Sequence, residues 1–321
     1  MLGRLLLLGC LLASPGSALA QSYPDRTVTI VVTSAAGALT DVLTRAVSQR
    51  LSQMWNQSVV VENRGGAGHS LAATAVLRAE HDGYTLLSSE TGFITSQPHL
   101  YAKGKMPYDP DEFIPVAGYA GIPEALLVNP SVPAKSVSEL IALAKEKPGS
   151  VTYGTAGIGT ALHTGALLLE GLTGVKLTAV HYRGAAPALN DLMAGHINMI
   201  TMGPSVALPA VKAGTLRMLG FGGEKRVTQF PDVPTIAETV PGYEATVAFG
   251  LFAPKGTPAN VIAKINADVH RIIDDPEFYK RFLEPLVVQP LPGSQDAFAE
   301  YLRKDTAKWA KVIGAANVKL D

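Results

Sequence analysis

Short β-branched or apolar runs alternate with segments whose apolar residues recur at helical spacing. The predicted strands are Thr27–Thr33, Ser58–Glu62, Tyr84–Ser89, Phe113–Ala120, Ala125–Val128, Val151–Tyr153, Leu177–His181, Ile197–Thr201, Leu216–Phe221 and Phe249–Phe252. The predicted helices are Leu39–Met54, Ser70–Ala79, Ser136–Lys147, Leu162–Leu172, Pro187–Gly195, Ser205–Ala213, Ala259–Ile273 and Asp296–Ile313. This alternation predicts an α/β protein with mostly parallel sheets flanked by helices.

The stretch Val151–Gly174 carries the most informative boundary between a strand and a helix. A turn of small residues, including Thr155, Gly159 and Thr160, leads into a helix with His163 in its first turn. The first N–H groups of a helix have no intrahelical partner and carry partial positive charge. The turn therefore suits an anion such as a carboxylate or phosphate. The alternative is an ordinary turn in which Thr160 caps the helix.

Three other loops repeat this combination of small residues, hydroxyl groups and a following helix or turn. In parallel sheets such loops share the carboxyl edge, where ligands bind. The candidate ligand-binding residues are Ser34, Ala36, Gly37, Asp41, Ser89, Glu90, Thr155, Gly159, Thr160, His163, Gly184 and Ala185. Asp41 either interacts favourably with the helix dipole or contacts the ligand. His163 either donates to the ligand or is packed in the core.

Common enzyme signatures are absent from the sequence. It contains no dinucleotide fingerprint, phosphate loop, G-x-S-x-G elbow or H-E-x-x-H helix. We therefore expect no enzymatic activity, no cofactor and no metal, with an exported hydrolase as the rival. The 27 basic and 27 acidic residues argue against a strongly basic nucleic-acid-binding protein.

The N-terminus has the features of a cleavable secretory signal. Arg4 precedes the apolar segment Leu5–Leu12, and Ala18–Ala20 has the pattern of a cleavage site, so residues 1–20 are the predicted signal peptide. We expect a soluble periplasmic protein. Leu7–Cys10 has some likeness to a lipoprotein box, and a lipid anchor at Cys10 is the less favoured alternative.

An ordered set of short motifs resembles one known family over nearly all of the chain after the signal. The motifs include Tyr23–Arg26, Val61–Arg64, Asp82–Tyr84, Pro107–Pro110, Gly157–His163, Tyr182–Pro187, Lys212–Gly214 and Pro231–Thr235. The sequence is similar to the substrate-binding proteins of the tripartite tricarboxylate transporter family, also called Bug proteins.

The resemblance implies a type II periplasmic-binding-protein fold with a ligand cleft between two lobes. Residues 21–122 plus 247–321 would form lobe 1 and residues 123–246 lobe 2, with hinges near Gly121–Ile122 and Thr246–Gly250. The implied ligand is a small carboxylate or amino-acid-like molecule held by amides, hydroxyls and waters. A monomer that delivers this ligand to integral-membrane transporter subunits is expected. A sensor that presents its ligand to a signalling partner is the alternative.

The chain also departs from the family pattern near the expected ligand. Thr33-Ser34 replaces the usual Pro-Phe, Ala38 replaces a glycine, and Glu90 stands where small neutral residues are commoner. A carboxylate at Glu90 would repel a simple dianion. We therefore expect Glu90 either to pair with a basic side chain or to face a cationic or hydroxyl group of the ligand.

Overall fold

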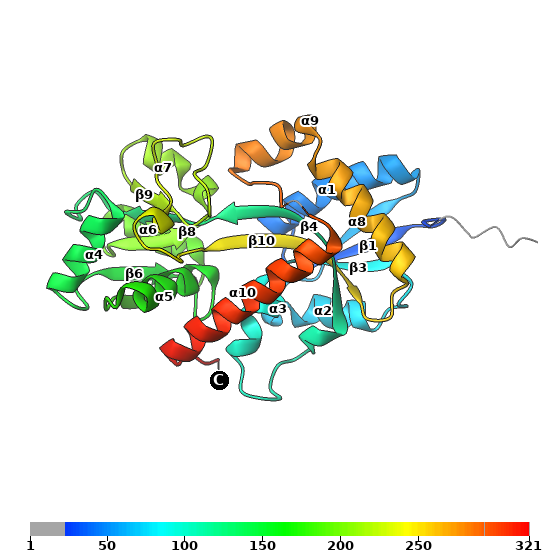
Figure 1. Cartoon of the computed structure of the whole chain (residues 1–321), viewed down its shortest axis with the longest axis horizontal. Coiled ribbons are helices and arrows are strands. Elements are labelled where there is room, and N and C mark those ends of the chain that lie inside the picture. Colours follow the sequence, from blue (N-terminus) through cyan, green and yellow to red (C-terminus); the bar gives the residue numbers. More distant parts are fainter. Residues whose placement is uncertain (1–22, 292, 321) are drawn as a thin grey trace, which may run out of the picture.

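The protein consists of two halves, each built on one sheet and joined by long strands (Figure 1). The structure, a computed structural model, describes residues 23–291 and 293–320. The predicted signal peptide, residues 1–20, lies outside the described residues. Within the described part of the chain, each half contains a five-stranded sheet flanked by helices, which confirms the α/β prediction.

The first sheet has the strand order β2-β1-β3-β10-β4. Its strands are β1 (Val28–Val32), β2 (Val59–Asn63), β3 (Thr85–Glu90), β4 (Phe113–Pro123) and β10 (Thr246–Pro254). The helices on this side of the molecule are α1 (Leu39–Trp55), α2 (Ser70–Leu77), α3 (Gly92–Thr95), α8 (Ala259–Ile273) and α9 (Pro276–Phe278). The loops after β1, β2 and β3 lie at one edge of the sheet, because these strands are parallel.

The second sheet has the strand order β7-β6-β8-β5-β9. Its strands are β5 (Ala125–Val128), β6 (Thr152–Thr155), β7 (Thr178–His181), β8 (Met199–Met202) and β9 (Arg217–Phe221). Its helices are α4 (Val137–Glu146), α5 (Ala161–Thr173), α6 (Ala185–Ala194) and α7 (Leu208–Lys212). Strands β6, β7 and β8 are parallel, so the loops that follow them share an edge as well.

One strand in each sheet runs against the others. β10 is antiparallel to β3 and β4, and β5 is antiparallel to β8 and β9. Both strands enter their sheet directly from the other half, without the crossover helix that a parallel connection requires. The expectation of mostly parallel sheets is confirmed, and the structure adds one reversed strand in each.

The chain crosses between the two sheets at two neighbouring places. Glu124 links β4 to β5, and its N–H donates to the carbonyl oxygen of Ala245, just before β10, at 3.0 Å. The Gly222 N–H in turn donates to the Glu124 carbonyl oxygen at 2.7 Å. Because the two crossings are bonded to each other, they form one connection.

The long C-terminal helix α10 (Gln295–Ala316) runs diagonally across both halves (Figure 1). Phe298, near its start, packs against Phe252 of β10 with ring centroids 5.7 Å apart. Trp309, near its end, lies in the core of the second half together with Leu169 of α5. The helix therefore brings side chains from the end of the chain to the boundary between the halves.

Two details differ from the sequence expectations. The predicted helix at Ser205–Ala213 is a 3₁₀ turn, Pro204–Val206, followed by the short α7, and proline at 204 and 209 favours separate helix starts. The loop after β3 contains the short helix α3, which the apolar pattern does not reveal. In the described residues we find no helix with the length and apolar character of a membrane span.

Candidate functional site

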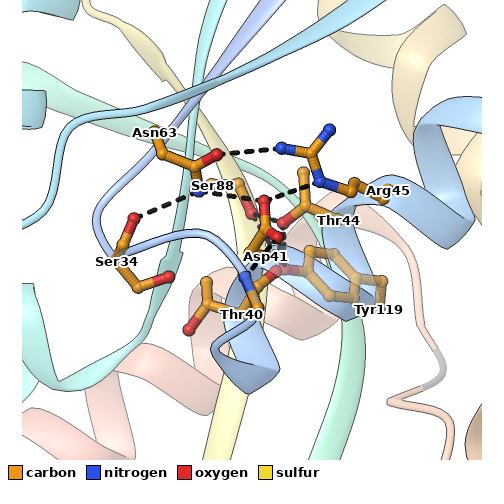
Figure 2. A network of polar contacts seen from close by, with 9 residues as sticks. Ser34, Thr40, Asp41, Thr44, Arg45, Asn63, Ser88 and Tyr119 are labelled. Atoms are coloured by element: carbon orange, nitrogen blue, oxygen red, sulfur yellow. Dashed lines mark hydrogen bonds and ion pairs between the residues drawn. The ribbon is translucent and has the colours of Figure 1, made fainter.

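The loop after β1, Ser34–Ala38, is shaped by the side chain of Asp41 (Figure 2). Asp41 is 3% exposed, and its Oδ2 accepts the Gly37 N–H at 2.8 Å. Its Oδ1 accepts from Asn63 Nδ2 at 2.9 Å and pairs with Arg45 Nε at 2.9 Å. Burial alone would raise the pKa of Asp41, but the bonds from Arg45, Gly37 and Asn63 lower it below its ordinary value. The carboxylate is therefore charged, and protein groups engage both of its oxygens.

The loop after β6 is held in a similar way by His163. The Gly159 N–H donates to His163 Nδ1 at 3.0 Å, so the ring carries its proton on Nε2. Burial, followed by the neighbouring His181, lowers the pKa of His163 to about 4, and the ring is neutral at neutral pH. Thr160 precedes α5, but its hydroxyl donates to the Gly157 carbonyl oxygen at 2.8 Å and makes no cap.

The two loops share one type of hydrogen bond, from a glycine N–H to a side chain in the following helix, which the sequence analysis did not predict. Gly37 and Gly159 have left-handed φ angles of 83° and 75°, and each N–H is bonded to the side chain four residues later. These two amides are consequently occupied by protein acceptors. The following helices α1 and α5, and also α6, have Ala38, Thr160 and Gly184 as N-cap residues, and none of these makes a side-chain cap. Apart from the His163 N–H, which donates to the Thr160 carbonyl oxygen at 2.9 Å, the first-turn N–H groups of these helices can attract an anion.

Replacing Asp41 with alanine is expected to destabilise the protein by about 1–3 kcal/mol, because the donors around it lose their acceptor. Asp41→Asn keeps an oxygen for the Gly37 N–H and should lose less. The pKa of Asp41 is lower in the folded protein than in the unfolded chain, where it is about 3.9. The charged carboxylate therefore stabilises the fold fully above that unfolded pKa. This stabilisation is lost as the pH falls through the pKa of the folded state. Urea unfolding at neutral and acidic pH measures both effects. An alanine variant as stable as the parent would show that the Asp41 contacts contribute nothing.

Hydroxyl groups support the strands behind the first loop. Thr44 Oγ1 lies 2.6 Å from Ser88 Oγ, which lies 2.8 Å from the hydroxyl of Tyr119 (Figure 2). Thr33 Oγ1 lies 3.0 Å from Ser89 Oγ, and both side chains are buried. Ser89 is therefore engaged by the protein and fixes the spacing between β1 and β3.

A cavity of about 400 Å³ lies between the two halves, a volume within the usual range for small-molecule sites. The end of β3 and the helix α3 contribute Glu90 and Thr95 to its wall. The start of α5 contributes Gly159–Leu162, and α10 contributes Asp305 and Trp309. The carboxyl edges of β3 and β6 thus meet at one cavity.

Glu90 forms a pair with His69 at the wall of this cavity. His69 Nε2 lies 3.3 Å from Glu90 Oε1, and the side chains are 16% and 40% exposed. Burial alone would raise the pKa of Glu90, but the contact with His69 lowers it below its ordinary value. Burial lowers the pKa of His69, but Glu90 outweighs this and leaves the pKa above its ordinary value. The sequence analysis expected Glu90 to pair with a base or to face the ligand, and its place in the structure permits both.

The structure gathers three of the twelve candidate residues in the cavity wall, namely Glu90, Gly159 and Thr160. Topology places the others on loops, strand ends or first helical turns at the carboxyl edges of the two sheets, outside this wall. They are Ser34, Ala36, Gly37, Asp41, Ser89, Thr155, His163, Gly184 and Ala185. Of these, Thr155 is fully buried, with Oγ1 2.8 Å from His181 Nδ1. The hydroxyl of Ser34 has no hydrogen-bond partner among the described residues.

Sequence reasoning missed the contributions of His69, α3 and α10 to the cavity. His69 follows the glycine-rich loop after β2, and this strand-turn-helix pattern was a usable signal. Asp305 and Trp309 gave no such signal, since they reach the cavity from the last helix of the chain.

Comparisons with known proteins identify relatives over nearly the whole chain. A sequence model described as tripartite tricarboxylate transporter family receptor matches residues 43–318. The chain is 30% identical to protein BugT of Bordetella pertussis, with 98% of each chain covered.

Two solved structures from Rhodopseudomonas palustris are also similar. One, with adipate, is 34% identical and has a TM-score of 0.78, covering 92% of this chain and 99% of its own. The other is MatC with bound malate, which is 32% identical and has a TM-score of 0.74, covering 91% of this chain and all of its own. The similarity therefore includes both halves.

Proposed function

The chain belongs to the tripartite tricarboxylate transporter receptor family, and we propose that it captures a small carboxylate-containing metabolite and delivers it to membrane transporter subunits. The family resemblance and the two-lobed fold expected from the sequence are confirmed. The family consists of periplasmic solute-binding receptors, so we propose a binding protein without enzymatic activity, exported to the periplasm.

The observation that carries this proposal is the cavity between the halves with the start of α5 in its wall. The N–H groups of Ala161 and Leu162 are in the first turn, where no intrahelical acceptor exists. No side chain caps this helix, so a ligand carboxylate is the natural acceptor. The adipate and malate in the two similar structures are small carboxylates as well.

We propose that the remaining candidate loops complete the site when the halves close on the ligand. Ser34, Ala36 and Gly37 would approach from the first half, and Gly184 and Ala185 from the second. Asp41 and His163 would act through the loops that they hold rather than through direct contact. Ser89 and Thr155, both buried, would support the strands beneath.

Closure would bend the single connection formed by the two crossings. We propose the division into lobe 1 (21–122 plus 247–321) and lobe 2 (123–246), with α10 packed on both. Hinge motion of this kind brings two lobes together around a ligand. A monomer that becomes more compact in X-ray scattering when the ligand is added supports this, and an unchanged profile with a bound ligand contradicts it.

The function is tested by a thermal-shift screen of mono-, di- and tricarboxylates, amino acids and aromatic acids on the purified mature protein. An acid present at about 100 times its dissociation constant should stabilise the protein by about 2.7 kcal/mol. The uncharged alcohol of the same carbon skeleton is the matched control and should give no shift. A protein that no carboxylate stabilises would contradict the proposed function.

A further inference from the structure

In the part of the chain that the structure describes, the ionisable side chains in the wall of the cavity include carboxylates but no strong base. Among the described residues in its wall there are two carboxylates, Glu90 and Asp305, and neither a lysine nor an arginine. Asp305 Oδ1 is paired with Lys308 at 2.8 Å, but Lys308 is outside the wall. Glu90, whose side chain is the more exposed of the two, would disfavour a second negative group of the ligand beside it.

Glu90 is the carboxylate that remains accessible. Its side chain is 40% exposed even though His69 lies 3.3 Å away, whereas the side chain of Asp305 is 4% exposed. One imidazole leaves most of the acceptor positions of a carboxylate unused, since each oxygen carries two lone pairs. The exposed part of Glu90 is therefore free to accept hydrogen bonds from a ligand.

The wall also holds a hydroxyl group that lacks a partner. Thr95 is fully buried, and its Oγ1 makes no hydrogen bond with any described residue. A buried hydroxyl without a partner costs free energy, and a polar ligand group in the cavity removes that cost. Thr95 comes from α3, which begins two residues after Glu90. The two side chains therefore mark one polar part of the wall.

From these contacts we infer that the site selects a carboxylate whose other end is an ammonium group, and that Glu90 is the residue that recognises this group. This inference rests on the proposed function and adds the ligand class to it. The ligand carboxylate takes the first-turn N–H groups of α5, and the ammonium group donates to Glu90 and Thr95. The preferred ligands thus differ from the dicarboxylates bound in the two similar structures.

The test uses pairs of acids that have the same number of carbon atoms and differ at one end. The pairs are β-alanine with malonate, γ-aminobutyrate with succinate, and ε-aminocaproate with adipate. Isothermal titration of the mature protein should show that the amino acid of the best-fitting pair binds at least about tenfold more tightly than its diacid. Glu90→Gln should reduce this preference by about tenfold or more, mainly through weaker binding of the amino acid.

Two further variants separate recognition from a general structural effect. Glu62 is 44% exposed and paired with Arg64 outside the cavity, so Glu62→Gln is the matched control and should leave the preference unchanged. His69→Gln removes the base beside Glu90 and should increase the preference for the amino acid. If His69 had only a structural role, His69→Gln would weaken the binding of both acids of a pair equally.

The outcomes distinguish this inference from the proposed function. If the diacids bind as tightly as the amino acids and Glu90→Gln leaves the ratio unchanged, the inference is wrong although the receptor function stands. If none of these acids and no other carboxylate in the screen binds, the proposed function fails.

Discussion

Replacing Gly159 with valine is expected to weaken carboxylate binding by about 30- to 100-fold, the equivalent of about 2–3 kcal/mol. Gly159 has a left-handed φ of 75°, and a Cβ atom placed on it would lie 2.2 Å from Leu100 Cδ1. Leu100 follows α3 in the first half, whereas Gly159 precedes α5 in the second. Valine would therefore collide with the buried side chain of Leu100 at the cavity wall and displace the start of α5.

Gly104 provides the control for backbone strain alone. It has a φ of 77°, and a Cβ atom there meets nothing within 4 Å, so Gly104→Val should leave affinity unchanged. Adding Leu100→Ala to the Gly159→Val variant removes the atoms that clash and should recover part of the affinity. Titration of all four proteins with one carboxylate measures this. Equal loss from Gly104→Val and Gly159→Val would contradict the steric explanation.

Replacing Glu124 with glutamine is expected to stabilise the protein by about 2–5 kcal/mol at alkaline pH, the second large effect. Glu124 lies at the connection between the halves, is 2% exposed, and its Oε1 has no hydrogen-bond partner among the described residues. Burial raises the pKa of this carboxyl to about 8, because the attraction of Lys308 is too weak to offset burial and the repulsion from Glu244. The folded protein therefore holds Glu124 as a neutral acid.

The direction of the pH dependence follows from this raised pKa. The unfolded chain releases the proton near pH 4.5, whereas the folded chain keeps it up to about pH 8. Stability therefore falls as the pH rises through this window, and the loss is complete above the folded pKa. Glutamine cannot ionise, so Glu124→Gln should remove this slope.

Urea unfolding at about pH 5 and about pH 8.5 measures the effect, with the exposed Glu146→Gln as the control. The parent and the control should lose stability between the two values, and Glu124→Gln should not. If the free energy of unfolding changed equally with pH in all three proteins, this would contradict a neutral, buried Glu124.

The order of strands and helices was predictable because each segment has a clear hydrophobic period. The predicted helix Ala259–Ile273 agrees with α8 residue for residue, and the predicted strand Ala125–Val128 agrees with β5. The reversal of β5 and β10 was not predictable, because strand direction depends on the half from which the chain enters. Neither the composition nor the spacing of apolar residues predicts from which half the chain enters a sheet.

The site was predictable only as far as it lies on the loops next to its strands. The sequence itself indicated the turn at Gly159–Thr160 and the unusual glutamate at position 90, and both lie in the cavity wall. The contacts that hold Asp41 and His163 were hidden, since a first-turn side chain looks the same whether it faces a ligand or the N–H four residues earlier. Asp305 reaches the cavity through the packing of α10, which no local motif encodes.

The most direct test of the central claim is a crystal structure of the mature protein with the tightest-binding acid from the screen. We predict that its carboxylate lies between the halves, at hydrogen-bond distance from the N–H groups of Ala161 or Leu162, with the rest of the ligand beside Glu90. A carboxylate bound at a surface lysine or arginine, with the cavity occupied only by solvent, would contradict the account.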